Sequence, residues 1–289
     1  MKEIYMTNTL SPIPRQEAES CMDRLLEQYP DVKKVLLIPP DFTRCYSYAG
    51  ELTQILYKKL APRVLVHIMP ALGTHMAMDE EEKQKMFGSE IPPEAFLDHH
   101  WQTDTVSIGI VPREVIEKIS QGLYSTEIEV EVNERLINGE YDLILSIGQV
   151  VPHEVVGMAN YSKNIFVGTG GRQMINKSHM LSAICGMEKA LGVADSPARK
   201  VFDYAQKHFL DGKLPLVYIQ TVTTLEKQNV ALHGLYIGAS RTPFEMAAAL
   251  SEQLNICHVE RRAKKLVTYL DPYELKTTWV GNKGIYRTR

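Results

Sequence analysis

The feature that most constrains the fold is a regular alternation of short apolar stretches with segments of helical periodicity. Residues 32–40, VKKVLLIPP, form an apolar run typical of a buried strand, and residues 48–61 place their apolar side chains at helical spacing. The pair recurs as a strand at 63–71 and a helix at 79–88. Such alternation is typical of parallel strands joined by crossover helices. We therefore predict an α/β fold in which helices flank a largely parallel, twisted sheet.

The second half of the chain continues this pattern. Residues 126–134 alternate between apolar and polar side chains, with Ile128, Val130 and Val132 on one face, which predicts a half-exposed edge strand. We expect Ser178 to be the N-cap of a helix. Further strands are predicted at 141–151, 214–226, 230–240 and 264–270, and further helices at 178–191, 197–210 and 243–256.

The bulk properties narrow the class of partner. A formal charge of −3 over 289 residues gives no electrostatic reason to expect nucleic acid or an anionic membrane. No apolar run approaches the roughly 20 residues that cross a bilayer. The cysteines are widely scattered and form no CxxC pair, which is typical of reduced thiols. We expect a cytoplasmic protein that acts on a small molecule, and we make no prediction of its oligomeric state.

Three of the predicted strands end in loops that carry reactive side chains. The first strand leads into DFTR, which supplies Asp41, Thr43 and Arg44. The second leads into ALGTH, which supplies His75, and the strand at 141–151 leads into PHE, which supplies His153. In open parallel sheets, ligands bind beyond the carboxyl ends of the strands. If these strands are neighbours, all three loops open onto one edge.

The residue types at these strand ends suit a carboxylic acid substrate. The paired N–H donors of Arg44 match the two oxygens of a carboxylate. Histidine titrates near neutral pH, so His75 and His153 could exchange acid and base roles on opposite faces of one carbon. The alternatives are ordinary: a loop histidine is often a solvated polar residue, and Asp41 could cap a helix while Arg44 pairs with a surface acid.

A glycine-rich stretch follows, FVGTGGRQMINKSH. Gly168, Gly170 and Gly171 would let the backbone approach a phosphate, although the spacing matches no nucleotide-binding fingerprint and a flexible turn is an equal alternative. His179, expected at the start of a helix, could ligate a metal. Lys163 could anchor a ligand covalently if it loses its proton; otherwise it is a surface lysine.

A second histidine group, FLDHHWQTD, places His99 beside His100. Adjacent residues of an extended chain point in opposite directions, so one of them at most would face a given site. A catalytic zinc site needs three ligands around an open position, and His99, His153 and His179 could supply them. A divalent-metal hydrolase therefore stays an alternative, although the HExxH spacing is absent.

Together these motifs resemble the nickel-dependent lactate racemase family. The resemblance extends from about residue 35 to the C-terminus and includes the distances from His153 to Lys163 and His179. It is carried by DFTR at 41–44, ALGTH at 71–75, HH at 99–100, IGQVVPHEVVG at 147–157, Lys163 and His179.

The resemblance implies a racemase or epimerase of 2-hydroxy acids that works by proton-coupled hydride transfer. The implied cofactor is a nickel-pincer pyridinium mononucleotide, which protein made without its biosynthetic enzymes is expected to lack. The matching positions imply His179 as the nickel ligand, Lys163 as the covalent anchor, and His75 and His153 as the acid–base pair. They further imply Asp41, Thr43, Gly168, Gly170 and Gly171 around the cofactor, and Arg44 and Lys283 on the substrate.

The resemblance also implies two domains and shows departures from the family pattern. Residues 1–255 would be the N-terminal catalytic domain, and 256–289 the start of a truncated second α/β domain. Met76 stands where members often have arginine, and NYSK, with Asn160 and Ser162, where many have a glycine pair; His99–His100 replaces a His–Asp pair. A larger hydroxy acid than lactate, such as a sugar acid epimerised at C2, is one hypothesis. A relative that binds a ligand without catalysis is another alternative.

Overall fold

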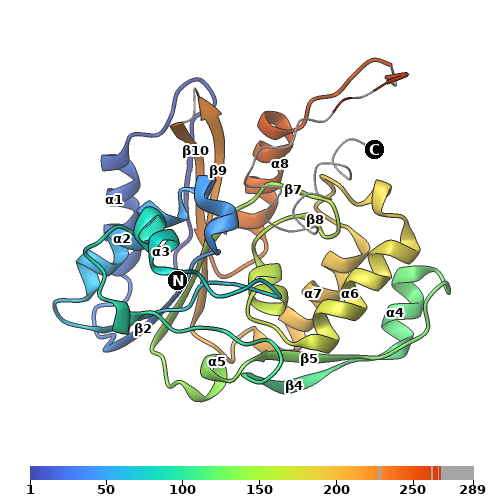
Figure 1. The fold of residues 1–289 in the computed structure, drawn as a ribbon, viewed down its shortest axis with the longest axis horizontal. Helices are drawn as coiled ribbons and strands as arrows, with labels where there is room; N and C mark the ends of the chain where they lie inside the picture. Colours follow the sequence, from blue (N-terminus) through green and yellow to red (C-terminus); the bar gives the residue numbers. More distant parts are fainter. Residues whose placement is uncertain (227–228, 262, 266, 268–289) are drawn as a thin grey trace.

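A computed structural model describes residues 1–226, 229–261, 263–265 and 267 of the chain (Figure 1). The predicted strand at 264–270 and Lys283 therefore lie wholly or mostly outside the described residues. So does most of the expected second domain. Among the described residues, no helix combines the length and the apolar composition needed to span a bilayer.

A six-stranded sheet forms the centre of the molecule, in the order β1-β10-β9-β6-β2-β3. Four of these strands run parallel to one another: β3 (Leu65–Ile68), β2 (Lys34–Ile38), β6 (Leu143–Gln149) and β9 (Leu216–Glu226). β10 (Asn229–Gly238) and β1 (Ile4–Thr7) add antiparallel strands at the other edge. The predicted α/β fold with a mostly parallel sheet is confirmed.

Helices cover both faces of this sheet (Figure 1). α1 (Arg15–Leu26), α2 (Ala49–Leu60) and α3 (Glu80–Phe87) pack on one face, and α6 (Arg172–Cys185), α7 (Pro197–Ala205) and α8 (Thr242–Asn255) on the other. Side chains of β2 alternate between the two cores, which is why its sequence is apolar at consecutive positions.

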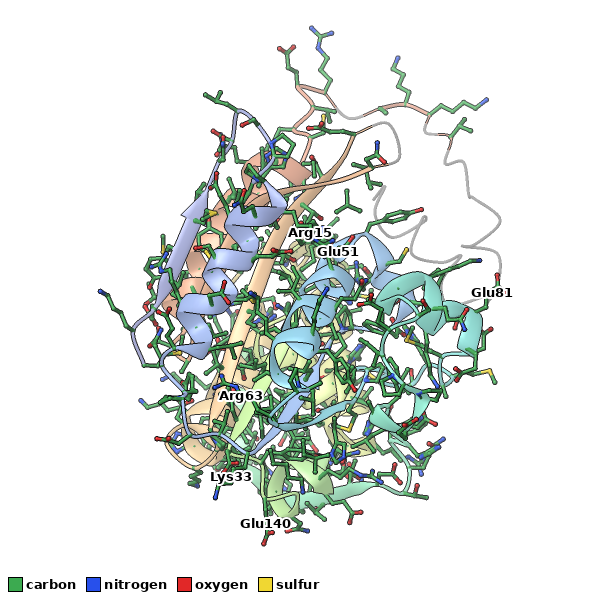
Figure 2. All side chains as sticks on the ribbon, turned by 90° about the vertical axis from the view of Figure 1, so that its left-hand side faces the viewer. Arg15, Lys33, Glu51, Arg63, Glu81 and Glu140 are labelled. Carbon is green, nitrogen blue, oxygen red and sulfur yellow. The ribbon has the colours of Figure 1, made fainter. Side chains whose placement is uncertain are left out.

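The amino ends of the parallel strands gather at one end of the molecule. Figure 2 shows Lys33, Arg63 and Glu140, which precede β2, β3 and β6, close together there. All three are exposed. The carboxyl ends, with their reactive loops, consequently share the opposite edge.

The strand predicted at 126–134 is β5 (Ile128–Asn133), and its apolar face is fully buried as expected. It does not join the main sheet. It pairs antiparallel with β4 (Thr105–Val111), which the sequence did not predict, in a separate two-stranded ribbon packed on α6. α4 (Arg113–Ser120) connects β4 to β5, and α5 (Glu134–Asn138) follows β5.

Helix α6 begins at Arg172, six residues before the predicted start, so the expectation of an N-cap at Ser178 is wrong. Its N-cap is Gly171, and Ser178 is a buried residue within the helix. A glycine cap contributes no side-chain signal, whereas a serine resembles a cap wherever it occurs. At its C-terminal end, α7 continues as a π-helical turn, Gln206–Leu210.

Candidate active site

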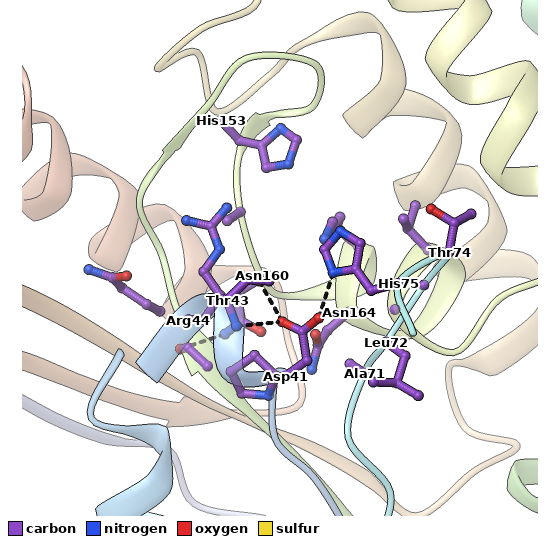
Figure 3. Close-up of a pocket in the computed structure, with 18 of the residues that line it drawn as sticks. Asp41, Thr43, Arg44, Ala71, Leu72, Thr74, His75, His153, Asn160 and Asn164 are labelled. Carbon is purple, nitrogen blue, oxygen red and sulfur yellow. Dashed lines mark hydrogen bonds and ion pairs between the residues drawn. The ribbon is translucent and has the colours of Figure 1, made fainter. Parts of the chain in front are cut away.

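The three reactive loops meet in one pocket. β6, β2 and β3 are adjacent and parallel, so their carboxyl ends lie at the same edge of the sheet. Figure 3 shows Arg44, His75 and His153 directed into the same space. The predicted residues that line this pocket are Asp41, Thr43, Arg44, His75, His153, Lys163, Gly168 and His179.

Asp41 holds His75 in a defined orientation. Asp41 is the N-cap of the short 3-10 helix Phe42–Ser47, and one of its oxygens accepts hydrogen bonds from the amide (3.2 Å) and hydroxyl (2.5 Å) of Thr43. Its other oxygen lies 2.5 Å from Nδ1 of His75. A carboxylate only accepts, so Nδ1 carries a proton, and in the neutral form of the ring it is Nε2 that is left unprotonated. His75 is thereby arranged as a base.

The charges around Asp41 keep it ionised. Burial by itself raises the pKa of this carboxyl, because it disfavours the charged form. The hydrogen bonds from His75 and Thr43, with the electrostatic interactions of Asp41 with His75 and Lys163, outweigh that effect and lower the pKa of Asp41 below its ordinary value. Asp41 is therefore an anion near neutral pH.

His153 lies in a hairpin on the opposite side of the pocket from Asp41. β7 (Pro152–His153) pairs with β8 (Gly157–Met158), and the intervening turn brings the amides of Val155 and Val156 to within 3.1 and 3.4 Å of Nδ1 of His153. Since these amides donate, Nδ1 accepts, and the neutral ring carries its proton on Nε2. The two histidines therefore have opposite tautomers.

His179 presents a neutral imidazole to the pocket. It lies two turns inside α6 rather than at the helix start, because the helix begins earlier than predicted. Its Nδ1 donates to the carbonyl of Ile175 at 2.7 Å, which leaves Nε2 as the available nitrogen. Burial, assisted by the charge of Lys163, lowers the pKa of His179 to about 4. A neutral imidazole with one nitrogen available is the form that ligates metals.

Lys163 follows a loop whose backbone is held in an uncommon conformation. Asn160 and Tyr161 have φ angles of 62° and 55°, in the left-handed region that favours glycine. Tyr161 is retained there by packing, because its ring stacks on Phe244 with centroids 5.2 Å apart. Its neighbour Asn160 donates to the carbonyl of Gly148 at 2.7 Å and lines the pocket.

Arg199 on α7 holds the same loop in place through hydrogen bonds. The sequence did not indicate this role. Arg199 is fully buried and donates to the carbonyls of Met158 (2.6 Å) and Asn160 (3.1 Å) and to the hydroxyl of Ser162 (3.0 Å). Its guanidinium lies 4.5 Å from the ring centre of Phe244. Burial lowers the pKa of Arg199 to about 9, so it remains a cation at neutral pH.

The glycine segment divides into two parts. Gly168 lines the pocket, whereas Gly170 and Gly171 do not. They are glycines for packing reasons, since a Cβ on Gly170 would lie 1.9 Å from the Phe166 carbonyl and one on Gly171 would meet Glu131. The Glu131 carboxylate also accepts from the Gln173 amide at 2.6 Å, so an acidic side chain occupies the start of α6 where a phosphate was expected.

Gln149 and Asn164 also line the pocket and were not predicted. Asn164 Nδ2 donates to the carbonyl of Ile38 and to the hydroxyl of Ser146, both at 3.1 Å, and so ties the pocket floor to β2 and β6. The available signal was an amide at the start of the apolar run NIFV, because a buried amide needs hydrogen-bond partners.

The second histidine group lies outside the pocket. His99 is buried, with Nε2 3.2 Å from the carbonyl of Gly170 and Nδ1 2.9 Å from Nδ2 of Asn133, so it supports the glycine segment. His100 pairs with Asp104. The set His99, His153 and His179 is not brought together, and the described residues contain no group of three or more acidic, histidine or cysteine side chains placed to hold a metal.

The buried His99 predicts a loss of stability on acidification. Burial lowers its pKa from the ordinary 6.5 to about 4. Between these values the unfolded chain binds a proton that the folded chain does not, so the stability is complete above pH 6.5 and is lost as the pH falls. At about 1.4 kcal/mol per pH unit, His99 accounts for roughly 2 kcal/mol between pH 6.5 and pH 5. Urea unfolding at pH 7 and pH 5 measures this loss.

The variant His99→Gln, which can keep both hydrogen bonds without titrating, should lose correspondingly less stability over that interval. His208→Gln, at an exposed histidine, is the control and should behave as the wild type does. An identical acid loss in His99→Gln and wild type would contradict the assignment.

Comparison with known proteins identifies the fold and a family. The family model for the lactate racemase N-terminal domain matches residues 17–192. A crystal structure of a protein from Thermotoga maritima is similar with a TM-score of 0.80 and 27% identity, over 89% of this chain and 62% of that one. The lactate racemase apoprotein from Thermoanaerobacterium thermosaccharolyticum is similar with a TM-score of 0.64 and 20% identity, over 84% of this chain and 56% of that one. No curated protein matches the chain. The chain thus spans about three-fifths of the length of these two proteins.

Proposed function

We propose, from the premise that this chain belongs to the lactate racemase N-terminal domain family, that it inverts the hydroxyl-bearing carbon of a 2-hydroxy acid. The observation that carries the proposal is the arrangement of the pocket. Two histidines and an arginine, from the segments that follow three adjacent parallel strands, line one pocket, and in their neutral forms the two histidines have opposite tautomers. The reaction class is an isomerisation, and the substrate is a small carboxylic acid.

Each of these side chains has a role that follows from its chemistry. The guanidinium of Arg44 binds the substrate carboxylate through two parallel hydrogen bonds. His75 accepts the hydroxyl proton at Nε2, with its Nδ1 proton kept on Asp41. His153 then returns a proton to the oxygen from the other side. A 2-keto acid exists between these two transfers, and the carbon is left with either configuration.

The pocket residues fit the nickel mononucleotide that the family resemblance implies. His179 offers a neutral nitrogen for the metal, because its other nitrogen is bonded to Ile175. Lys163 lines the same pocket as the covalent anchor, and Gly168 lines it beside Ala71, whose Cβ would lie 2.6 Å from a Cβ on Gly168. When bound, such a group accepts and returns the α-hydrogen as hydride. Lys283 stays a proposed substrate contact outside the described residues.

The lining supports a substrate larger than lactate. Of the departures from the family pattern, Asn160 lines the pocket, whereas Ser162 is bonded to Arg199 and Met76 is exposed. A second hollow adjoins the pocket and shares Arg44 and Gln149 with it. Its polar residues are Tyr46, Thr223, Thr224 and Asn255. Hydroxyl and amide groups suit the remaining hydroxyls of a sugar acid.

Cofactor loading tests the proposal directly. Protein co-produced with cofactor-making enzymes should contain one nickel per chain and show a covalent mass increase, both measurable by metal analysis and intact-mass spectrometry. Lys163→Ala should lose the mass increase. Lys177→Ala, at a half-buried lysine of α6 that does not line the pocket, should keep it. Bound zinc without a mass increase would favour a hydrolase, and neither metal nor adduct would favour a non-catalytic relative.

A further inference from the structure

Glu154 is a buried carboxylate that the fold leaves without a hydrogen bond. Its residue is 3% exposed, and both carboxylate oxygens are inaccessible and have no hydrogen-bond partner among the described residues. Burying an unsatisfied carboxylate is costly, so natural structures rarely keep one without a use. The cost indicates a second state in which this group is paired.

The ring of His153 lies within ion-pair reach of Glu154, which also interacts electrostatically with His179. Oε2 lies 3.8 Å from Nδ1 of His153, within ion-pair reach but beyond a hydrogen bond. In this structure Nδ1 of His153 accepts a hydrogen bond from the amide of Val155, so the ring is neutral. A neutral ring has no charge for a carboxylate to stabilise. His153 and Glu154 are thus adjacent but not hydrogen-bonded to each other.

The proposed reaction requires the other state. A histidine that gives a proton to the substrate oxygen must first be an imidazolium, with a second proton on Nδ1. That proton would face the N–H of Val155, which cannot accept it. A modest rotation brings it instead to a carboxylate 3.8 Å away.

We propose that Glu154 is the positioning residue that stabilises the charged form of His153, as Asp41 does for His75. The inference rests on the proposed acid–base role of His153. In the step itself, the Nε2 proton passes to the substrate oxygen, the Nδ1–H bond stays intact, and Glu154 gains and loses only a hydrogen bond. Two carboxylate–histidine pairs then serve the two faces of one pocket.

The surroundings of His153 explain why a counter-charge is needed. Arg44 from the loop after β2 and Lys163 from the loop after β8 line the same pocket and oppose a positive ring. His75 and His179 also line the pocket and carry no negative charge that could offset a positive ring, and the carboxylate of Asp41 is hydrogen-bonded to His75. Glu154 supplies a negative charge on the Nδ1 side of His153.

Nuclear magnetic resonance of the cofactor-free protein tests the pairing without catalysis. With 13C-labelled histidine, the titration midpoint of His153, assigned with His153→Gln, should move to lower pH by at least about one unit in Glu154→Gln. Glu51→Gln removes a carboxylate from α2, which does not line the pocket, and should leave the midpoint unchanged. In wild type, the Glu154 carboxyl carbon should shift at the same midpoint, which needs no substitution.

An unchanged His153 midpoint in Glu154→Gln, or a Glu154 resonance that ignores the His153 titration, would overturn the inference. Either result would leave the proposed racemase function standing, since that depends on cofactor loading and turnover. Loss of cofactor binding with the coupled titration intact would refute the function and retain the pair. In cofactor-loaded protein, Glu154→Gln should lower kcat and move the pH profile, with KM little changed.

Discussion

Replacement of His75 or His153 by alanine is expected to reduce inversion of the substrate about 10²–10⁴-fold, the range that a positioned acid or base contributes. The two rings serve opposite sides of one pocket, so neither can substitute for the other. The folded state should persist, because neither ring belongs to the apolar cores. Chiral chromatography of the product from cofactor-loaded protein gives the rate, and circular dichroism checks the fold.

The matched control is His100→Ala, which removes an exposed histidine paired only locally with Asp104. It should retain full activity. If the double variant His75→Ala, His153→Ala still inverted the substrate at the wild-type rate, the two-histidine scheme would be wrong.

Substitution of Arg199 should give the largest loss of stability. Arg199→Met keeps an unbranched apolar stem but removes three hydrogen bonds, two of them to the carbonyls of Met158 and Asn160. Hydrogen bonds from a charged donor contribute about 1.5–3 kcal/mol each, and relief of the buried charge offsets part of the loss. The expected net decrease in the free energy of unfolding is about 2–4 kcal/mol, measured by urea denaturation at pH 7.

Arg199→Met should also disturb the pocket, because it releases the loop that leads to Lys163. This loop contains Asn160 and Tyr161, whose φ angles lie in the left-handed region. Arg63→Met, at an exposed arginine ahead of β3, is the control and should change stability by less than about 0.5 kcal/mol. Equal stability of Arg199→Met and wild type would show that the desolvation cost of Arg199 cancels its hydrogen bonds.

Much of the site was predictable because it depends on strand order. Apolar runs identified β2, β3 and β6, and parallel connections bring their carboxyl ends to one edge. The residues immediately after each run were therefore the right candidates for the pocket. Their placement needed no knowledge of side-chain packing.

The features that were not predicted depend on contacts between residues far apart in the chain, which local sequence patterns do not reveal. β4 was missed because its partner β5 is found only through long-range pairing. Arg199 resembles any arginine of a polar helix face until the packing buries it. Glu154 looks like a surface acid beside a histidine, and only the fold deprives it of partners.

The most direct test of the account follows the α-hydrogen. Cofactor-loaded protein would be incubated in water with single stereoisomers of 2-hydroxy acids deuterated at C2, lactate and gluconate among them, and the inverted product analysed by chiral separation and mass spectrometry. Because the two histidines move only the hydroxyl proton, the inverted product should retain deuterium at C2. An inverted product that carries hydrogen from water would contradict the account, since a histidine would then have removed the α-hydrogen as a proton.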